Sequence, residues 1–145
     1  MKTRKKRVLF LCTKNSCRSQ MAEGIVNHEL CDSWVAYSAG LVPSEVHPTA
    51  KRVMKEIDID ISGQFSKYLD RFENAPFDVI ITLCGNVDAQ CPTWVGEQKK
   101  VHIGFLDPAS AAGSEKEVLQ IFRMVRDDIR REVLGYFSKL DAETR

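Results

Sequence analysis

The stretch CTKNSCRS, residues 12–19, lies between an apolar run and a helical pattern. The run VLFL, residues 8–11, is typical of a buried parallel strand. A strand, a tight loop and a helix N-terminus in succession form a natural anion site, because free backbone N–H groups and the helix dipole both favour negative charge. We call residues 12–19 the anion loop.

Three side chains of the anion loop can take part in chemistry. Cys12 supplies a thiol, and the helix end together with Arg18 favours its thiolate, which is the nucleophilic form. Arg18 can hold two oxygens of a tetrahedral oxyanion with its planar fork, and Ser19 can donate a hydrogen bond to the sulfur. The loop is not a Walker A motif, because the Gly-Lys-Ser/Thr ending is absent. The alternative is a strand–helix turn that happens to contain two cysteines.

Length and charge limit the class of protein. The chain has 145 residues, enough for one compact domain and too few for two. The net charge of +1 does not argue for nucleic-acid binding, and we interpret the basic residues 1–7 as a frayed terminal tail. There is no apolar run of membrane-spanning length and no apolar signal-peptide region, so we expect a cytoplasmic protein that does not bind membranes.

The cysteine and histidine pattern argues against disulfides and metals. Five cysteines are an odd number without the spacing of a disulfide framework, so we expect thiols. No Cys-x2-Cys pair is present, and the three histidines form no ligand spacing, so we expect no metal and no cofactor. Cys31 is interpreted as a thiol without a catalytic role, and His47 as a loop or capping histidine.

Apolar periodicity predicts an α/β fold. The expected strands are residues 8–11, 34–39, 77–83 and 100–103. The expected helices are residues 19–30, 48–57, 67–72 and 114–140, the last beginning with a capping box from Ser114 to Glu117. Strands that alternate with helices imply a doubly wound, four-stranded parallel sheet with helices on both faces, in one domain that spans residues 1–145.

Two further groups are expected beside the anion loop. In a parallel sheet, the loops that follow the C-terminal strand ends line the ligand crevice. Cys84 directly follows the strand at 77–83, and Asp107 lies in the loop after the strand at 100–103. Both should open onto the same edge as Cys12, where Asp107 can protonate a departing oxygen. Cys91 is a third thiol, in the loop after Cys84. The alternative interpretation of Asp107-Pro108 is an ordinary turn, and that of Cys84 and Cys91 is two unrelated buried thiols.

Cys-x5-Arg-Ser near the N-terminus, with Asp107-Pro108 far downstream, resembles the low-molecular-weight protein tyrosine phosphatase fold. The sequence from Cys12 onward, with MAEG at residues 21–24 and the pair Cys84 and Cys91, is similar to the thioredoxin-coupled arsenate reductases of that fold. The resemblance implies that Cys12, Cys84 and Cys91 are the working cysteines and Asp107 the acid. It implies arsenate as substrate, phosphate or sulfate as competing oxyanions, and oxyanion binding by Thr13, Lys14, Asn15, Ser16, Cys17 and Arg18.

Some members of this family bind a potassium ion beside the loop. The resemblance matches Asn15, Glu23 and Ser38 to three contributors of that site, whereas Lys67 stands where an aspartate is expected. We therefore predict a remnant potassium site in which the Lys67 ammonium takes the place of the cation, so that potassium has little effect. The plainer interpretation of Glu23 is a carboxylate near a helix start.

Three functions remain open. The nucleophile, arginine and acid alone describe a phosphatase that works through a phosphocysteine at Cys12, although residues 109–112 lack the aromatic side chains usual after Asp-Pro in phosphatases. The thiol pair favours an arsenate reductase in which Cys84 attacks the Cys12 sulfur and Cys91 then attacks Cys84. Its reductant is expected to be thioredoxin or glutaredoxin, and the protein a monomer. An oxyanion- or redox-sensing module is the third possible function. The presence of Asp107 argues against it, because a sensor needs no general acid.

Overall fold

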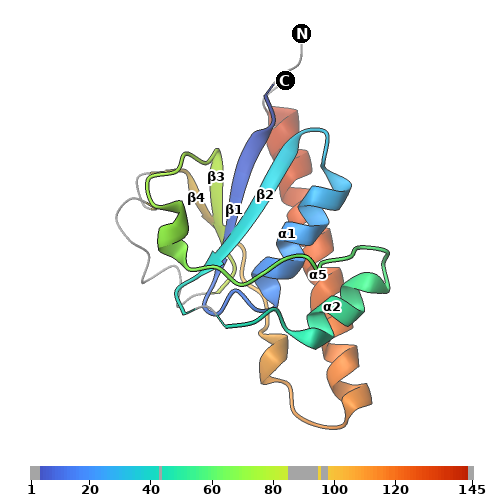
Figure 1. The fold of residues 1–145 in the computed structure, drawn as a ribbon. Helices are drawn as coiled ribbons and strands as arrows, with labels where there is room; N and C mark the ends of the chain where they lie inside the picture. The colour runs from blue at the N-terminus through green and yellow to red at the C-terminus, as the bar shows by residue number, and fades with distance from the viewer. Residues whose placement is uncertain (1–3, 43, 85–94, 96–97, 144–145) are drawn as a thin grey trace.

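A computed structural model describes residues 4–42, 44–84, 95 and 98–143 of the chain. Four strands form one parallel sheet in the order β2-β1-β3-β4 (Figure 1). They are β1 (Lys6–Cys12), β2 (Trp34–Gly40), β3 (Val79–Thr82) and β4 (Lys100–His102). The doubly wound four-stranded fold class is therefore confirmed, and the central strand β1 ends at Cys12.

The register brings the strand ends to one edge. Cys12 pairs with Gly40 of β2, and Leu11 pairs with Thr82 of β3. Thr82 in turn pairs with His102 of β4. The chain therefore leaves β1, β3 and β4 at the same edge of the sheet, as the sequence pattern predicted.

The three α-helices cover one face of the sheet, and the 3-10 helix η1 (Leu69–Phe72) lies against the other. The α-helices are α1 (Arg18–Glu29), α2 (Pro48–Lys55) and α5 (Glu115–Glu143), and Figure 1 shows them gathered on one side of the strands. Val8 and Phe10 of β1 point into this larger core. Leu9 and Leu11 alternate to the other face, where they pack with Leu69 of η1.

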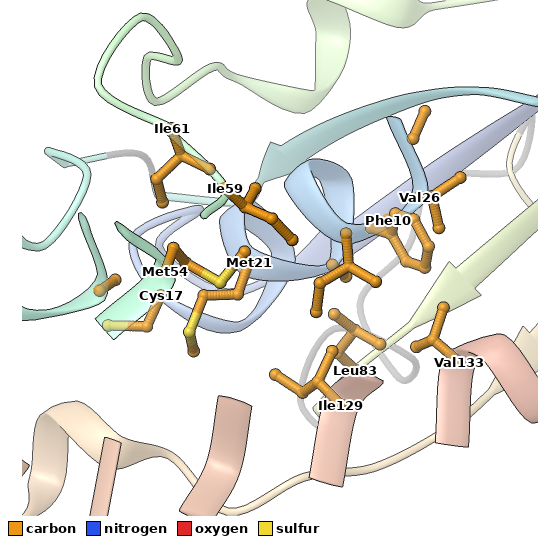
Figure 2. Packing of buried hydrophobic residues seen from close by; sticks show 14 of the residues in the cluster. Phe10, Cys17, Met21, Val26, Met54, Ile59, Ile61, Leu83, Ile129 and Val133 are labelled. Carbon is orange, nitrogen blue, oxygen red and sulfur yellow. The ribbon is translucent and has the colours of Figure 1, made fainter. Parts of the chain in front are cut away.

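The helix after the anion loop is buried on more than its apolar stripe. Every residue of α1 from Ser19 to Val26 is buried. Figure 2 shows Ile59 and Ile61 on one side of this helix and Ile129 and Val133 of α5 on the other. The segment near residue 60 packs against α1 at Gly24, where Ile59 and Ile61 approach the helix, so polar side chains of α1 are enclosed as well.

Several predicted boundaries need correction. β1 begins at Lys6, so Lys6 and Arg7 belong to the sheet and not to the terminal tail. The physical reason is that Arg7 has partners: its backbone N–H donates to Asp78 at 2.7 Å, and its guanidinium lies over the rings of Tyr37 and Phe77. The predicted helix at 67–72 is the shorter 3-10 helix η1, α2 ends at residue 55 rather than 57, and α5 extends to residue 143.

The predicted capping box of the last helix is confirmed. The Ser114 hydroxyl accepts from the backbone N–H of Glu117 at 3.2 Å, and the Glu117 carboxylate accepts from the backbone N–H of Ser114 at 3.3 Å. Within the described ranges, no helix is both long and apolar enough to cross a bilayer.

Candidate active site

A cavity of about 330 Å³ opens at the C-terminal edge of the sheet. Its lining residues come from three separate parts of the chain: Cys12, Thr13, Lys14, Ser16, Cys17, Arg18, Cys84, Asp107 and Ala109. The structure thus brings the predicted nucleophile, arginine, acid and second thiol together. Cys91, the predicted third thiol, lies outside the described residues.

The backbone of the anion loop turns sharply at Asn15. This residue has a φ of 52°, in the left-handed region that asparagine tolerates better than most residues. The turn lets the chain reverse between the end of β1 at Cys12 and the start of α1 at Arg18. The positive end of the α1 dipole therefore lies at the floor of the cavity.

A chain of hydrogen bonds fixes the direction of the Ser19 hydroxyl. The backbone N–H of Lys67 donates to Asn15 Oδ1 at 2.7 Å, which turns Asn15 Nδ2 toward Ser19. That amide donates to Ser19 Oγ at 2.8 Å, and Ser19 Oγ lies 2.9 Å from Cys12 Sγ, where the hydroxyl is the donor when Cys12 is a thiolate. The hydroxyl is therefore placed to donate a hydrogen bond to the nucleophilic sulfur.

Arg18 and Asp107 face each other across the cavity. Arg18 Nη2 lies 3.7 Å from Asp107 Oδ2, and Arg18 Nη1 donates to the backbone oxygen of Phe105 at 3.2 Å. Asp107 also caps the 3-10 helix η2 (Pro108–Ser110), where its Oδ1 accepts from the N–H of Ala109 at 3.0 Å. The guanidinium is mostly buried, whereas the Asp107 side chain is 41% exposed, so a ligand can reach the carboxyl group.

Cys84 meets the anion loop directly. Its Sγ lies 3.2 Å from the Thr13 hydroxyl, and Thr13 is the residue next to Cys12. Cys84 is half-buried and is a free thiol, as are Cys12, Cys17 and Cys31. The expectation that the end of β3 places a second thiol beside the first is therefore confirmed by the geometry.

Cys17, the other cysteine of the loop, is buried and packs against the larger core, as Cys12 does. Figure 2 shows its side chain beside Met21 and Met54, and it is 3% exposed. Burial raises the pKa of the Cys17 thiol to about 12, so it stays protonated and unreactive at neutral pH. Any role of Cys17 in oxyanion binding must come from its backbone N–H.

The interpretation of Glu23 as a helix-end carboxylate is wrong. Glu23 lies in the second turn of α1 and is buried, where its Oε1 accepts from the Ser38 hydroxyl at 2.6 Å and lies 3.6 Å from Lys67 Nζ. Burial raises the pKa of Glu23 and lowers the pKa of Lys67, and the charge of each partner opposes the shift of the other. The two groups form a buried ion pair beneath the anion loop.

Two residues that shape the loop were missed in the sequence. Gln20 is fully buried, and its Nε2 donates to the backbone oxygens of Asn15 and Phe65 at 3.1 and 3.0 Å. A Cβ on Gly40 would lie 2.8 Å from both Asn15 N and Thr13 O, so only glycine lets β2 end against the loop. A glycine at a strand end carries no local sign of such a close approach.

The structure places His47 and Cys31 outside the set of residues that line the cavity. His47 caps α2, because its Nδ1 accepts from the N–H of Thr49 at 3.1 Å, and Pro48 takes the first helical position. Cys31 is exposed beyond the end of α1 and lies outside the cavity. In the described part of the chain, no group of three or more His, Cys, Asp or Glu side chains is placed to hold a metal ion.

The fold and the Cys-x5-Arg cavity define a class of protein. The low molecular weight phosphotyrosine protein phosphatase family matches residues 7–145, and the chain belongs to this family. Two curated relatives are more specific, and both are arsenate reductases. The arsenate reductase of Halalkalibacterium halodurans is 46% identical over 129 residues, 89% of this chain and 93% of that protein. The arsenate reductase of Bacillus subtilis is 46% identical over 122 residues, 84% of this chain and 88% of that protein.

Solved structures give the same two likenesses. An arsenate reductase in the phosphate binding state superposes with a TM-score of 0.81 at 37% identity, covering 92% of this chain and 98% of its own. A low molecular weight protein tyrosine phosphatase from T. tengcongensis superposes with a TM-score of 0.75 at 26% identity, covering 92% and 99%.

Proposed function

We propose that this protein is an arsenate reductase that works through a three-cysteine relay of Cys12, Cys84 and Cys91. The observation that carries the proposal is the second thiol: Cys84 lines the same cavity as Cys12, and its Sγ lies 3.2 Å from the hydroxyl of Thr13. A phosphatase needs no thiol at that place. The identity of 46% to two arsenate reductases supports the same choice.

The anion loop is the proposed arsenate site. Its backbone N–H groups and the guanidinium of Arg18 hold the oxygens of the tetrahedral anion, and they stabilise the charge that develops on those oxygens. Phosphate or sulfate competes at the same place, because it presents a similar set of oxygens. That a related arsenate reductase was solved in a phosphate binding state supports this expectation.

The first chemical step forms a covalent adduct. The Cys12 thiolate attacks arsenic(V), a sulfur–arsenic bond forms, and one arsenate oxygen leaves. Asp107, when protonated, gives its proton to that oxygen so that it departs as water. The cap of η2 and the Arg18 contact orient the carboxyl group for this transfer.

The second and third steps are thiol–disulfide exchange. The Cys84 thiolate attacks the Cys12 sulfur, the sulfur–arsenic bond breaks, and its electron pair stays on arsenic, which is released as arsenite. Cys91 then attacks Cys84, which frees Cys12 and leaves a Cys84–Cys91 disulfide. A cellular dithiol protein, thioredoxin or glutaredoxin, reduces this disulfide and returns the enzyme to its starting state.

A phosphatase is the second candidate, since Cys12, Arg18 and Asp107 together can form and hydrolyse a phosphocysteine. The wall of the cavity weakens it: Ala109 lines the site directly after Asp107-Pro108, and none of the described lining residues is aromatic. A phosphotyrosine ring would have no aromatic surface to stack on there. We expect only residual activity on a small aryl phosphate.

A single-turnover reaction tests the proposal. Fully reduced protein is mixed with arsenate without added thiol, quenched with an alkylating agent, and its disulfides are mapped by mass spectrometry while arsenite is quantified. A Cys84–Cys91 disulfide with about one arsenite per protein is expected. Five alkylated thiols and no arsenite would overturn the proposal, and aryl phosphate turnover would then separate a phosphatase from a sensor.

Variants sharpen the same experiment. Cys84→Ser should abolish arsenite release, because nothing can displace the Cys12 adduct, and should leave aryl phosphate hydrolysis intact. Cys31→Ser is the matched control, since Cys31 is exposed and outside the cavity, and it should release arsenite like the unaltered protein. Arsenite release by Cys84→Ser at the unaltered rate would contradict the relay.

A further inference from the structure

A buried cation belongs to the floor of the anion loop. The side chain of Lys67 is 8% exposed, and that of its partner Glu23 is 12% exposed. The Lys67 ammonium donates to the backbone oxygen of Phe65 at 2.8 Å and lies 4.7 Å from the centre of the Phe65 ring. A lysine costs free energy to bury, so a lysine held by a carboxylate, a carbonyl and a ring serves some structural or functional purpose.

This cation and the reactive thiol are linked through one short path. The backbone N–H of Lys67 orients the Asn15 amide, that amide orients the Ser19 hydroxyl, and the hydroxyl meets Cys12 Sγ. The ammonium fixes residues 65–67 from the far side, through Glu23 of α1. The position of the Lys67 N–H therefore depends on the ion pair of its own side chain.

The same residues do not fit a bound potassium ion. Glu23 Oε1 accepts from the Ser38 hydroxyl and faces the Lys67 ammonium, and Asn15 Oδ1 accepts from the Lys67 backbone. The oxygens that would coordinate a monovalent cation are thus already in use. The ammonium also puts a positive charge where the ion would have to lie.

We propose that Lys67, paired with Glu23, is a built-in cation that positions Asn15 and, through it, the Ser19 hydroxyl at Cys12. Lys67 is a positioning residue and touches no substrate. The nucleophile then needs no bound monovalent ion. This inference concerns Cys12 itself, so it holds whether the substrate is arsenate or a phosphate ester. Its test uses neither substrate.

The test measures the rate at which iodoacetamide alkylates Cys12 in the reduced protein between pH 5 and pH 9. Lys67→Met keeps the length of the side chain and removes its charge. The alkylation rate at pH 6 is expected to fall about tenfold and to recover toward pH 9, since a displaced Ser19 hydroxyl no longer donates to the sulfur. Because the thiol of an unfolded chain also alkylates fast at pH 9, circular dichroism of each variant is recorded in parallel, and only variants with the unaltered spectrum are compared.

Three further variants keep the result interpretable. Arg71→Met is the matched control, because Arg71 is an exposed cation over the same Phe65 ring, and its profile should equal that of the unaltered protein. Glu23→Gln with Lys67→Met leaves no uncompensated charge, so it carries the test if the single variant fails to fold. Asn15→Gly keeps the left-handed backbone and removes the amide, so Lys67→Met should have no further effect in that background.

The proposal is overturned if the folded double variant, Glu23→Gln with Lys67→Met, has the same profile of Cys12 alkylation rate against pH as the unaltered protein. It is also overturned if Lys67→Met adds its full effect to Asn15→Gly, because the action would then not pass through the amide. Finally, exchange of sodium for potassium should leave the alkylation of the unaltered protein unchanged. A clear rise in potassium would show that an ion, and not Lys67, completes the site.

Discussion

The Ser19 hydroxyl lies 2.9 Å from Cys12 Sγ and receives its own hydrogen bond from Asn15, so it donates its proton to the sulfur when Cys12 is a thiolate. A bond of this kind to a charged group contributes about 1.5 to 3 kcal/mol. Ser19→Ala should therefore slow the alkylation of Cys12 at neutral pH by about tenfold or more. Ser62→Ala, at an exposed position, is the control. Equal alkylation rates in the two variants would refute the assigned direction of this bond.

The close approach of Gly40 to the anion loop predicts a steric effect. A Cβ there would lie 2.8 Å from two backbone atoms of the loop, whereas a Cβ on Gly135 of α5 would meet no atom within 4 Å. Gly40→Ala should lower the free energy of unfolding by about 1 to 3 kcal/mol. Gly135→Ala should raise it by about 0.5 to 1 kcal/mol, because alanine favours a helix interior. Urea denaturation measures both changes, and a Gly40→Ala variant of unaltered stability would contradict the argument.

An ion-pair network joins α2 to α5 and should make stability depend on pH. Glu56 accepts hydrogen bonds from Arg123 Nε and Nη2, the shortest at 2.9 and 2.7 Å, and from Arg126 Nη1 at 2.9 Å. The bond from Arg123 is the main cause that lowers the pKa of Glu56 from 4.5 to about 2. A lowered carboxyl pKa stabilises the fold above the unfolded value, and this contribution is lost as the pH falls toward the folded value.

Glu56→Gln should consequently destabilise the protein at pH 7 by about 1 kcal/mol, a value kept small because the pair is partly exposed to solvent. The difference from the unaltered protein should shrink between pH 4.5 and pH 2. Glu115→Gln breaks a far more exposed pair with Arg52 and should have no measurable effect. A Glu56→Gln deficit that persists undiminished below pH 3 would be inconsistent with this assignment.

The histidine cap of α2 predicts a second pH effect. Only the neutral ring of His47 can accept the hydrogen bond from the N–H of Thr49, and burial lowers the pKa of His47 from 6.5, partly opposed by Asp107. The unfolded chain thus binds this proton more readily, so stability should fall as the pH drops below about 6.5. His47→Asn keeps a capping side chain at every pH, and its stability should fall less between pH 7 and pH 5. Parallel stability curves for the two proteins would exclude this role of His47.

Much of the site was predictable because its signals are local or follow from the sheet. The apolar run before Cys12 and the helical pattern after Ser19 fix a strand, a loop and a helix within a few residues. Parallel strands then deliver Cys84 and Asp107 to the same edge, whatever the details of their loops. The cap of α5 at Ser114 was also predictable, because a capping box is a pattern of four consecutive residues.

The boundaries and the buried polar groups could not be predicted in the same way. Lys6 and Arg7 look like part of a charged tail until Asp78 and the rings of Trp34 and Phe77 give them partners. Glu23 looks like a helix-end carboxylate when only its neighbours in the sequence are considered. Its contacts in the fold come from β2 and from the segment before η1. In each case the deciding contact is made by a residue far away in the chain.

The sequence by itself determined the α/β fold, the anion loop and the shared edge of Cys12, Cys84 and Asp107, since these depend on periodicity and on strand direction. Only the tertiary structure decided that Lys67 holds Asn15 from 52 residues away, that Gly40 must lack a side chain, and that the thiol of Cys17 is buried. The physical reason is that burial and hydrogen-bond partners are properties of the packed chain: the same side chain is reactive, inert or structural according to what the fold places around it.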